Sequence, residues 1–283
     1  MKWTNKNKLN INHNRINKEG IKMNQLYSEK YVKDEKCDWL VFLHGFGGST
    51  KMWKRQIDSF KEKFNLLILD LPGHGKSSEG IANKGFNKFE EVAEMVIDVL
   101  KENKIEIATF VCVSLGTLVF AGIFDKYPEM VKGAVLCGAV MGMHKGWVGI
   151  LKICDKIRYC FPYMFLMNVF SGILLPLKAH QKSRKFFLKS GKLLGRKEFM
   201  AWFDLFVKDM NALRDLKTLS DLKENLLFIT GNEDFRFIKG VKKALNNLKC
   251  CHLKILNKCG HVCNIQKWQE FNEVSLKFIE NLS

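Results

Sequence analysis

The sequence predicts an α/β fold with a mostly parallel β-sheet that is covered by helices on both faces. Short, continuously apolar runs that close on glycine, such as residues 39–45 (WLVFLHG), are typical of strands buried on both faces. Segments with helical spacing of apolar residues alternate with these runs along the chain. Strands that alternate with helices form βα units, and βα units build a parallel sheet.

The predicted elements follow one another in a regular order. Residues 39–45 form a strand, and residues 64–75 repeat the design with a strand that runs into a Pro/Gly loop. Residues 88–103 place Val92, Val96 and Val99 on one face of an amphipathic helix. The remaining elements are strands at 108–113, 131–140, 225–231 and 252–257 and helices at 115–126, 238–248 and 267–281.

Residues 141–220 break this alternation, and we interpret them as a long, largely helical cap inserted between two strands. Within the cap, residues 159–177 are long and uncharged enough to be a membrane-span candidate. The prolines Pro162 and Pro176 near the ends of this segment argue against a span. We expect instead an apolar cap whose inner face lines a substrate pocket and whose outer face is solvated. Six basic residues follow the segment, at Lys178, Lys182, Arg184, Lys185, Lys189 and Lys192. Peripheral contact with an anionic membrane is therefore an alternative, which the sequence does not favour.

The composition is that of a folded domain with an inserted cap: 283 residues, 47% hydrophobic and 27% charged. The net charge of +17 comes without a base-recognition motif, so we expect solvated lysines and no nucleic-acid partner. Nine scattered cysteines without a secretory leader predict free thiols and a cytoplasmic protein. Residues 1–22 are basic and Asn-rich, and we expect a disordered tail or an extension upstream of a start at Met23.

Ser114 follows an apolar strand and precedes a helix in residues 110–117 (FVCVSLGT). A nucleophilic serine on a tight strand-to-helix turn has the signature G-x-S-x-G, because the turn needs small neighbours. Gly116 supplies the second glycine, whereas Cys112 stands at the first position. This stretch alone leaves two interpretations open, a catalytic nucleophile or a hydroxyl at the end of a buried strand.

A general base and an orienting acid follow later in the chain, each after a predicted strand. Asp234 lies in the loop after 225–231, and His261 lies after 252–257. The neighbour of Asp234 is Glu233, and a turn would direct only one of these carboxylates inward. The order Ser, Asp, His at one sheet edge indicates a hydrolase triad. The backbone N–H groups of Phe46 and Leu115 are the candidate oxyanion donors.

Two other sequence features contain histidine, and neither is predicted to be catalytic or metal-binding as a group. His74 lies in a Pro/Gly loop, and we expect it to hold that loop together. A group of Cys and His side chains has none of the spacings of a zinc site, so the sequence predicts no metal there. Its members are Cys250, Cys251, His252, Cys259, His261 and Cys263. A hydrolase triad of this kind also requires no cofactor.

From about residue 27 to its end, the sequence resembles the α/β-hydrolase superfamily. The resemblance rests on LHGFGGS (43–49), LDLPGHGKS (69–77), CVSLG (112–116), GNED (231–234) and GH (260–261). It implies an eight-stranded, mostly parallel sheet, with a core of 23–140 and 221–283 and a helical cap at 141–220. It further implies that Ser114 is the nucleophile, His261 the base and Asp234 the orienting acid, with Phe46 and Leu115 as oxyanion donors. Cys112 and Thr117 depart from the usual glycines of this family.

The implied activity is hydrolysis of a small-molecule carboxylic ester or thioester with a hydrophobic group, through an acyl-enzyme. A serine at the turn disfavours reactions that need a carboxylate nucleophile. Two alternatives stay open. One is other chemistry on the same fold: carbon–carbon bond hydrolysis, an elimination like that of the menaquinone pathway, or perhydrolysis. The other is a ligand-binding protein of the same fold with little catalysis.

Overall fold

The computed structural model describes residues 8–11, 26–141, 145–209, 225–246 and 251–282. In this part of the chain, one eight-stranded sheet has the strand order β1-β2-β4-β3-β5-β6-β7-β8. The first two strands are antiparallel to their neighbours, and all other neighbours are parallel. The strands are β1 (Lys8–Ile11), β2 (Ser28–Tyr31), β3 (Trp39–Leu43), β4 (Asn65–Leu69), β5 (Ala108–Val113), β6 (Val131–Cys137), β7 (Leu226–Gly231) and β8 (His252–Leu256).

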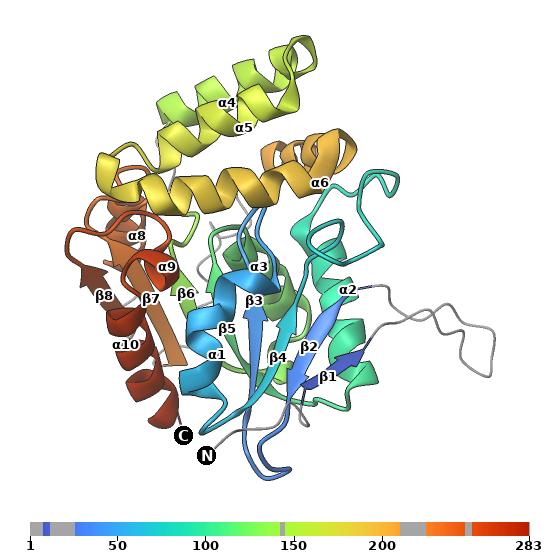
Figure 1. Cartoon of the computed structure of the whole chain (residues 1–283), viewed down its shortest axis with the longest axis vertical. Coiled ribbons are helices and arrows are strands. Elements are labelled where there is room, and N and C mark those ends of the chain that lie inside the picture. The colour runs from blue at the N-terminus through green and yellow to red at the C-terminus, as the bar shows by residue number, and fades with distance from the viewer. Residues whose placement is uncertain (1–7, 12–25, 142–144, 210–224, 247–250, 283) are drawn as a thin grey trace.

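Helices cover both faces of this sheet (Figure 1). One face carries α2 (Phe89–Glu102), α3 (Leu115–Lys126) and α8 (Ile238–Leu245), and the other carries α1 (Lys54–Phe60), α9 (Cys263–Gln266) and α10 (Trp268–Glu280). Alternate strand residues serve the two faces, because successive side chains of a strand point in opposite directions. Val41 and Leu43 pack on the α2 and α3 side, whereas Leu40 and Phe42 pack on the α1 and α10 side. The predicted fold class is confirmed.

The N-terminal segment differs from the prediction at one place. Residues 8–11 are not a disordered tail, because they form β1 and pair with Ser28–Tyr31 of β2 at the edge of the sheet. The sequence KLNI alternates polar and apolar residues, a period that suits an edge strand. Backbone pairing places this strand without the long apolar run that marks the central strands. The rest of the predicted tail lies outside the described residues.

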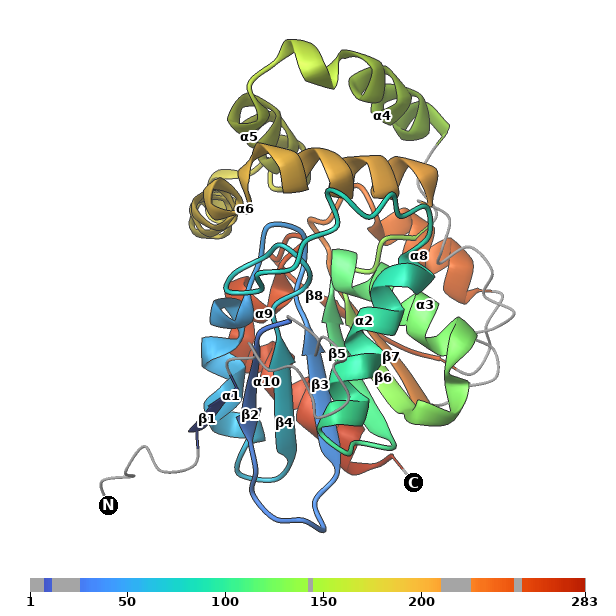
Figure 2. The same ribbon diagram turned by 90° about the vertical axis from the view of Figure 1, so that its right-hand side faces the viewer.

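Three helices form the cap, namely α4 (Lys145–Ile157), α5 (Tyr163–Leu174) and α6 (Gln181–Lys208). Figures 1 and 2 show them stacked beyond the carboxyl ends of the parallel strands. The membrane-span candidate is divided by Pro162, which precedes α5, and by the end of α5 at Leu174. No helix of the described ranges is long and apolar enough to cross a membrane. The predicted cap boundary at 220 lies outside the described residues.

Glycines with a positive φ end one strand and interrupt one helix. The predicted strand 131–140 ends at Cys137, because Gly138 turns the chain with φ 56°. Gly195 interrupts α6 with φ 78° and ψ 164°, so α6 consists of two helical stretches. The first turn matters for the site, since the carbonyl of Cys137 at the end of β6 accepts the N–H of Ser114 at 2.9 Å.

Candidate active site

Ser114 occupies a strained turn between β5 and α3. Its φ of 51° and ψ of −113° lie in a region that side-chain-bearing residues rarely adopt. The turn is held by backbone and side-chain bonds, since the Ser114 carbonyl accepts the N–H of Thr117 at 2.8 Å and its hydroxyl at 2.6 Å. Backbone strain of this kind is typical of functional sites.

The residues around the turn explain how it accommodates both a glycine and a cysteine. A Cβ on Gly116 would lie 2.3 Å from the carbonyl oxygen of Leu43, so a side chain is excluded there. Cys112 is fully buried on the sheet face that carries α2 and α3, where its side chain packs in the core. The departure from the usual motif therefore leaves the turn intact. Thr117 also fits, because its Oγ1 accepts the N–H of Val140 at 3.3 Å.

The three predicted triad side chains lie in one chain of hydrogen bonds. Nε2 of His261 lies 2.8 Å from Oγ of Ser114, and Nδ1 of His261 lies 2.8 Å from Oδ2 of Asp234. Asp234 is fully buried, and His261 is 2% exposed. Because an ionised carboxylate only accepts hydrogen bonds, the Nδ1 atom carries the proton and Nε2 is free to accept the serine proton. The arrangement can activate Ser114 as a nucleophile.

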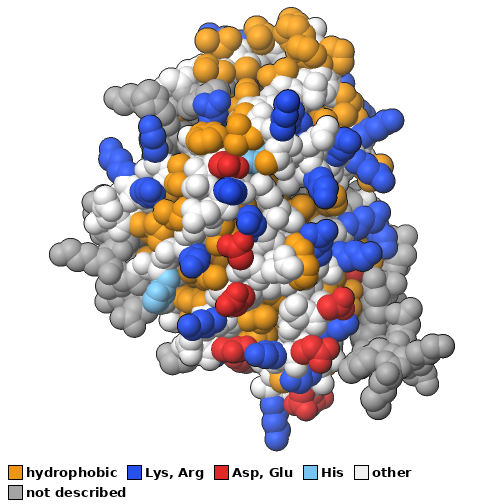
Figure 3. Space-filling view, turned by 60° about the vertical axis from the view of Figure 1, so that its left-hand side comes forward, with side chains coloured by type: hydrophobic (Ala, Val, Ile, Leu, Met, Phe, Trp, Pro, Cys, Tyr) orange, Lys and Arg blue, Asp and Glu red, His pale blue; other side chains and the backbone are white. Residues whose placement is uncertain are grey.

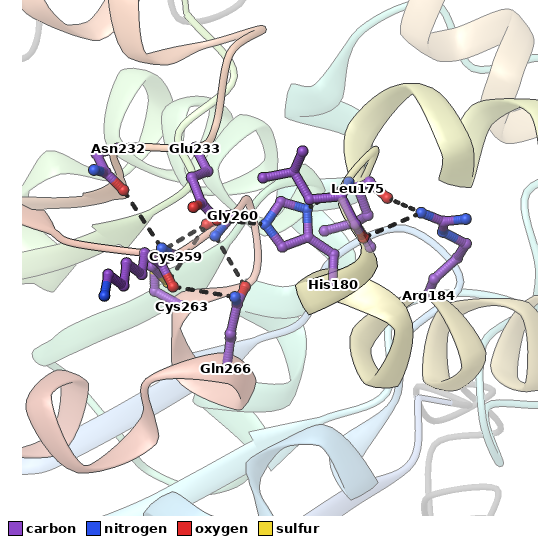
Figure 4. Close-up of polar contacts among 11 residues, drawn as sticks. Leu175, His180, Arg184, Asn232, Glu233, Cys259, Gly260, Cys263 and Gln266 are labelled. Carbon is purple, nitrogen blue, oxygen red and sulfur yellow. Dashed lines mark hydrogen bonds and ion pairs between the residues drawn. The ribbon is translucent and has the colours of Figure 1, made fainter.

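The neighbouring carboxylate, Glu233, points away from these three hydrogen-bonded side chains and contacts the cap. Its Oε2 lies 2.9 Å from Nε2 of His180, a fully buried side chain that precedes α6 (Figure 4). The His180 ring also packs directly on Gly260, where a Cβ would come within 2.8 Å of it. One cap side chain therefore contacts the residues next to both Asp234 and His261. Sequence reasoning missed this pair, because no motif links a cap histidine to a loop 53 positions away.

Two buried histidines hold the loops of the predicted oxyanion site. Nε2 of His44 accepts the N–H of Leu71 at 2.9 Å, and Nε2 of His74 accepts the N–H of Gly47 at 3.0 Å. Burial lowers the pKa of His44 to about 4, and burial together with the neighbouring His44 lowers the pKa of His74 well below its usual range. Both rings are therefore neutral at neutral pH and can accept these bonds. Within its own loop, Nδ1 of His74 lies 3.0 Å from the carbonyl oxygen of Pro72, so His74 also holds this loop, as expected from the sequence.

The two predicted oxyanion donors come from two segments that line the same pocket as Ser114. Leu115 is the first residue of α3, and Phe46 lies in the loop after β3, where Gly45 approaches the serine. A Cβ on Gly45 would lie 3.2 Å from the Cβ of Ser114. As the first residue of α3, Leu115 has no intrahelical acceptor for its N–H. Within the described part of the chain, the N–H of Phe46 donates to no backbone carbonyl of a turn or loop. Both are thus available to a developing oxyanion, beside the positive end of α3.

An apolar pocket lies between the core and the cap, and Ser114 and His261 line it together with Phe46 and Leu115. The Phe46 ring lies 5.7 to 6.4 Å from three aromatic rings of the cap, measured between ring centroids. These rings are Phe170, Phe187 and Phe199. The cap therefore supplies apolar walls directly above the strained serine.

In the cysteine and histidine group, His261 bonds to Ser114 and Asp234, whereas the buried cysteines pack in the core. Cys259 and Cys263 are fully buried, and His252 is exposed at the outer strand β8. Hydrogen bonds with Cys137 and Cys259, and burial, raise the pKa of the Cys263 thiol well above its usual range. Among the described residues, no cluster of three or more His, Cys, Asp or Glu side chains is placed to hold a metal. Cys250 lies outside the described residues.

Comparison with known proteins gives a consistent result. A model of the alpha/beta hydrolase fold family matches residues 38–197. A putative carbamate hydrolase of Acinetobacter baylyi is 33% identical over 87% of this chain and 95% of its own length. A pimeloyl-acyl-carrier-protein methyl ester esterase of Yersinia enterocolitica is 34% identical over 40% of this chain and 42% of its own length.

Several of these matches cover only part of the relative's length. The chain spans less than half of the length of several curated relatives, including the Yersinia esterase. The solved structure of an N-acyl homoserine lactone degrading enzyme has a TM-score of 0.73 at 19% identity, over 89% of this chain and 96% of that chain, which shows a shared fold. The family model covers more than half of the sequence, and the chain therefore belongs to the alpha/beta hydrolase fold family.

Proposed function

We propose that this member of the family is a serine hydrolase that cleaves a carboxylic ester, or a thioester, with a hydrophobic group. The observation that carries the proposal is the unbroken chain of hydrogen bonds from Asp234 through His261 to Ser114 beside an apolar pocket. The esterase among the relatives supports the same reaction class.

In the proposed reaction, Nε2 of His261 accepts the proton of Ser114 Oγ as this oxygen attacks the carbonyl carbon. The N–H groups of Phe46 and Leu115 bind the oxyanion of the tetrahedral intermediate. When the intermediate collapses, the bond to the leaving oxygen or sulfur breaks, and His261 returns the proton to that atom. Water then attacks the acyl-enzyme, His261 accepts a proton from it, and the free acid leaves as Ser114 regains its hydrogen.

Asp234 has an electrostatic part in this scheme. Each proton transfer makes His261 an imidazolium in a site where both partners are buried. The carboxylate of Asp234, 2.8 Å from Nδ1, stabilises that charge and keeps Nε2 unprotonated before the attack. We infer that Asp234, and not Glu233, is the orienting acid, because Glu233 bonds to His180.

The cap supports a substrate with a hydrophobic group. Leu166, Phe170 and Phe187 line the pocket from α5 and the first stretch of α6, and Phe199 and Trp202 line it from the second. Apolar walls with a few polar groups at one end are typical of sites that bury an acyl or alkyl chain. The described lining residues include no aspartate or glutamate.

The test is a panel of p-nitrophenyl esters of increasing acyl length, together with a thioester and a carbamate. The carbamate is included because the relative that matches 87% of this chain is a putative carbamate hydrolase. We expect turnover that favours longer acyl chains, is lost in Ser114→Ala and is retained in the control Ser190→Ala. No turnover of the panel by a protein whose Ser114 still reacts with an activated phosphonate would favour the other chemistries of this fold. Absence of both ester turnover and reaction with the phosphonate, in a folded protein, would favour a ligand-binding role.

A further inference from the structure

Helix α5 has no charged residue on any side, and its exposed side carries Asn168 beside apolar side chains. Its sequence, YMFLMNVFSGIL, contains no charged residue. Met167, Ser171 and Leu174 are buried, whereas Phe165 is 51% and Val169 44% exposed. Soluble helices normally place polar residues on the side that faces water, and a helix that is apolar all round is normally buried on all sides. The exposed parts of Phe165 and Val169 therefore have no apolar cover within the described protein.

Exposed apolar side chains also occur on α4 and on the turn that joins α4 to α5. We call the exposed apolar side chains of α4, this turn and α5 the cap stripe. Its members are Ile150, Ile153, Ile157, Phe161, Phe165 and Val169, of which Ile150 and Val169 also line the apolar pocket. The three isoleucines recur at helical spacing on α4, and the rings of Phe161 and Phe165 stack at 5.4 Å. Figure 3 shows hydrophobic side chains gathered at the end of the molecule that the cap forms. An exposed apolar surface of this kind marks an interaction site.

Cations border the cap stripe. On α4, Lys152 and Lys156 are exposed beside the isoleucines, so that the outer face of this helix is apolar on one side and basic on the other. On α6, Lys192 and Arg196 lie next to the turn that joins α4 to α5. Nη2 of Arg196 donates to the Tyr159 carbonyl at 3.3 Å, and the Tyr163 hydroxyl donates to the Lys192 carbonyl at 3.2 Å.

The acidic residues of the cap do not offset this charge. Between residues 145 and 209 there are thirteen Lys and Arg but only four Asp and Glu. Asp155 and Asp204 pair with Arg158, Glu198 accepts the N–H groups of Ile81 and Ala82, and Asp209 accepts the N–H of Phe89. A second copy of this surface would bring two basic borders together, which disfavours self-association. An anionic bilayer matches both the apolar side chains and the cations.

We propose that the cap stripe, with its border of Lys152, Lys156, Lys192 and Arg196, docks the protein on an anionic membrane surface. The isoleucine and phenylalanine side chains enter the boundary between headgroups and acyl chains, and the cations contact lipid phosphates. The sequence does not favour this contact, because an apolar segment read alone does not reveal which of its residues face outward. Exposure of the cap stripe supplies that information.

The test is sedimentation of the full chain with two kinds of vesicle, phosphatidylcholine alone and phosphatidylcholine mixed with phosphatidylglycerol. The variants are Phe165→Asp and Ile153→Asp, and the matched control is Ile107→Asp, which makes the same charge change at a side chain that is 50% exposed outside the cap. Circular dichroism and gel filtration establish that each variant is folded and report its oligomeric state.

We expect the protein to bind the anionic vesicles, to bind the neutral ones at least about tenfold more weakly, and to lose binding on added salt. Each cap variant should weaken binding about tenfold, and Ile107→Asp should bind like the unmodified chain. Absence of vesicle binding, or equal loss in the control and the cap variants, would overturn the proposal. A dimer that Phe165→Asp dissociates, without vesicle binding, would identify the stripe as an interface between copies instead.

Discussion

Glu233 and Asp234 are adjacent carboxylates that bond to different histidines from different parts of the molecule. Asp234 accepts from His261 at 2.8 Å, and Glu233 lies 2.9 Å from His180 of the cap. The backbone fixes this division, since the N–H of Glu233 donates to the carbonyl of Cys259 while the N–H of Asp234 donates to the carbonyl of Gly231. The loop after β7 thus has one carboxylate in the candidate active site and one that bonds to a cap residue.

This division predicts opposite outcomes for the same chemical change at neighbouring positions. Asp234→Asn replaces an acceptor with an amide that favours the wrong tautomer of His261, and ester turnover should fall by about 10³ to 10⁴. Glu233→Gln keeps an acceptor for His180, and turnover should stay within a factor of about three. Steady-state kinetics on one ester tests both variants. Similar losses in the two variants would contradict the assignment of Asp234 as the sole orienting acid.

Gly116 should tolerate no side chain. In Gly116→Ala the new Cβ would lie 2.3 Å from the backbone oxygen of Leu43, and we expect a loss of about 3 kcal/mol in the free energy of unfolding. Gly149→Ala is the matched control, because no atom lies within 4 Å of its added Cβ, and it should be neutral or stabilising by up to about 1 kcal/mol. Urea unfolding measures both. A neutral Gly116→Ala would mean that the turn at Ser114 is not packed as described.

Cys112 departs from the family motif without disturbing the turn, so restoring a glycine should bring no gain in reactivity. Cys112→Gly removes a fully buried side chain from the core and adds backbone freedom, at a cost of about 2 kcal/mol. The rate of phosphonate labelling should stay within a factor of about three. A rate increase of more than tenfold would instead indicate that Cys112 restrains the serine turn.

The lowered pKa of His44 predicts that the folded protein loses stability in mild acid. Its pKa is about 4 in the folded protein, against about 6.5 for an unburied histidine, so between these values the unfolded chain binds more protons. The free energy of unfolding therefore falls as the pH drops from 6.5 to 4, by about 3 kcal/mol from this group. The stability of His44→Gln should depend less on pH over that window. Equal pH dependence in urea unfolding would contradict a neutral, buried His44.

Local patterns account for what the sequence predicted. The central strands were predictable because burial on both faces requires uninterrupted apolar runs, as in residues 39–43. The triad side chains were predictable because the carboxyl ends of parallel strands meet at one edge, which brings Ser114, Asp234 and His261 together. Their catalytic roles remain proposals.

Contacts between distant segments account for what the sequence did not predict. The His180–Glu233 pair joins a cap residue to a core loop, and neither residue belongs to a pattern that indicates the other. The support of Gly47 by His74 and of Leu71 by His44 likewise depends on how two loops meet. Strand β1 depends on backbone pairing at a sheet edge, and its four residues carry too weak a signal to stand out.

The central claim is that Ser114 is an activated nucleophile, and labelling with a fluorophosphonate probe tests it most directly. Mass spectrometry of the digested protein should find the phosphonyl group on Ser114. Labelling should be absent in Ser114→Ala and strongly slowed in His261→Ala, because His261 no longer accepts the proton of Oγ at 2.8 Å. A folded protein that is not labelled, or one whose labelling persists in Ser114→Ala, would contradict the account.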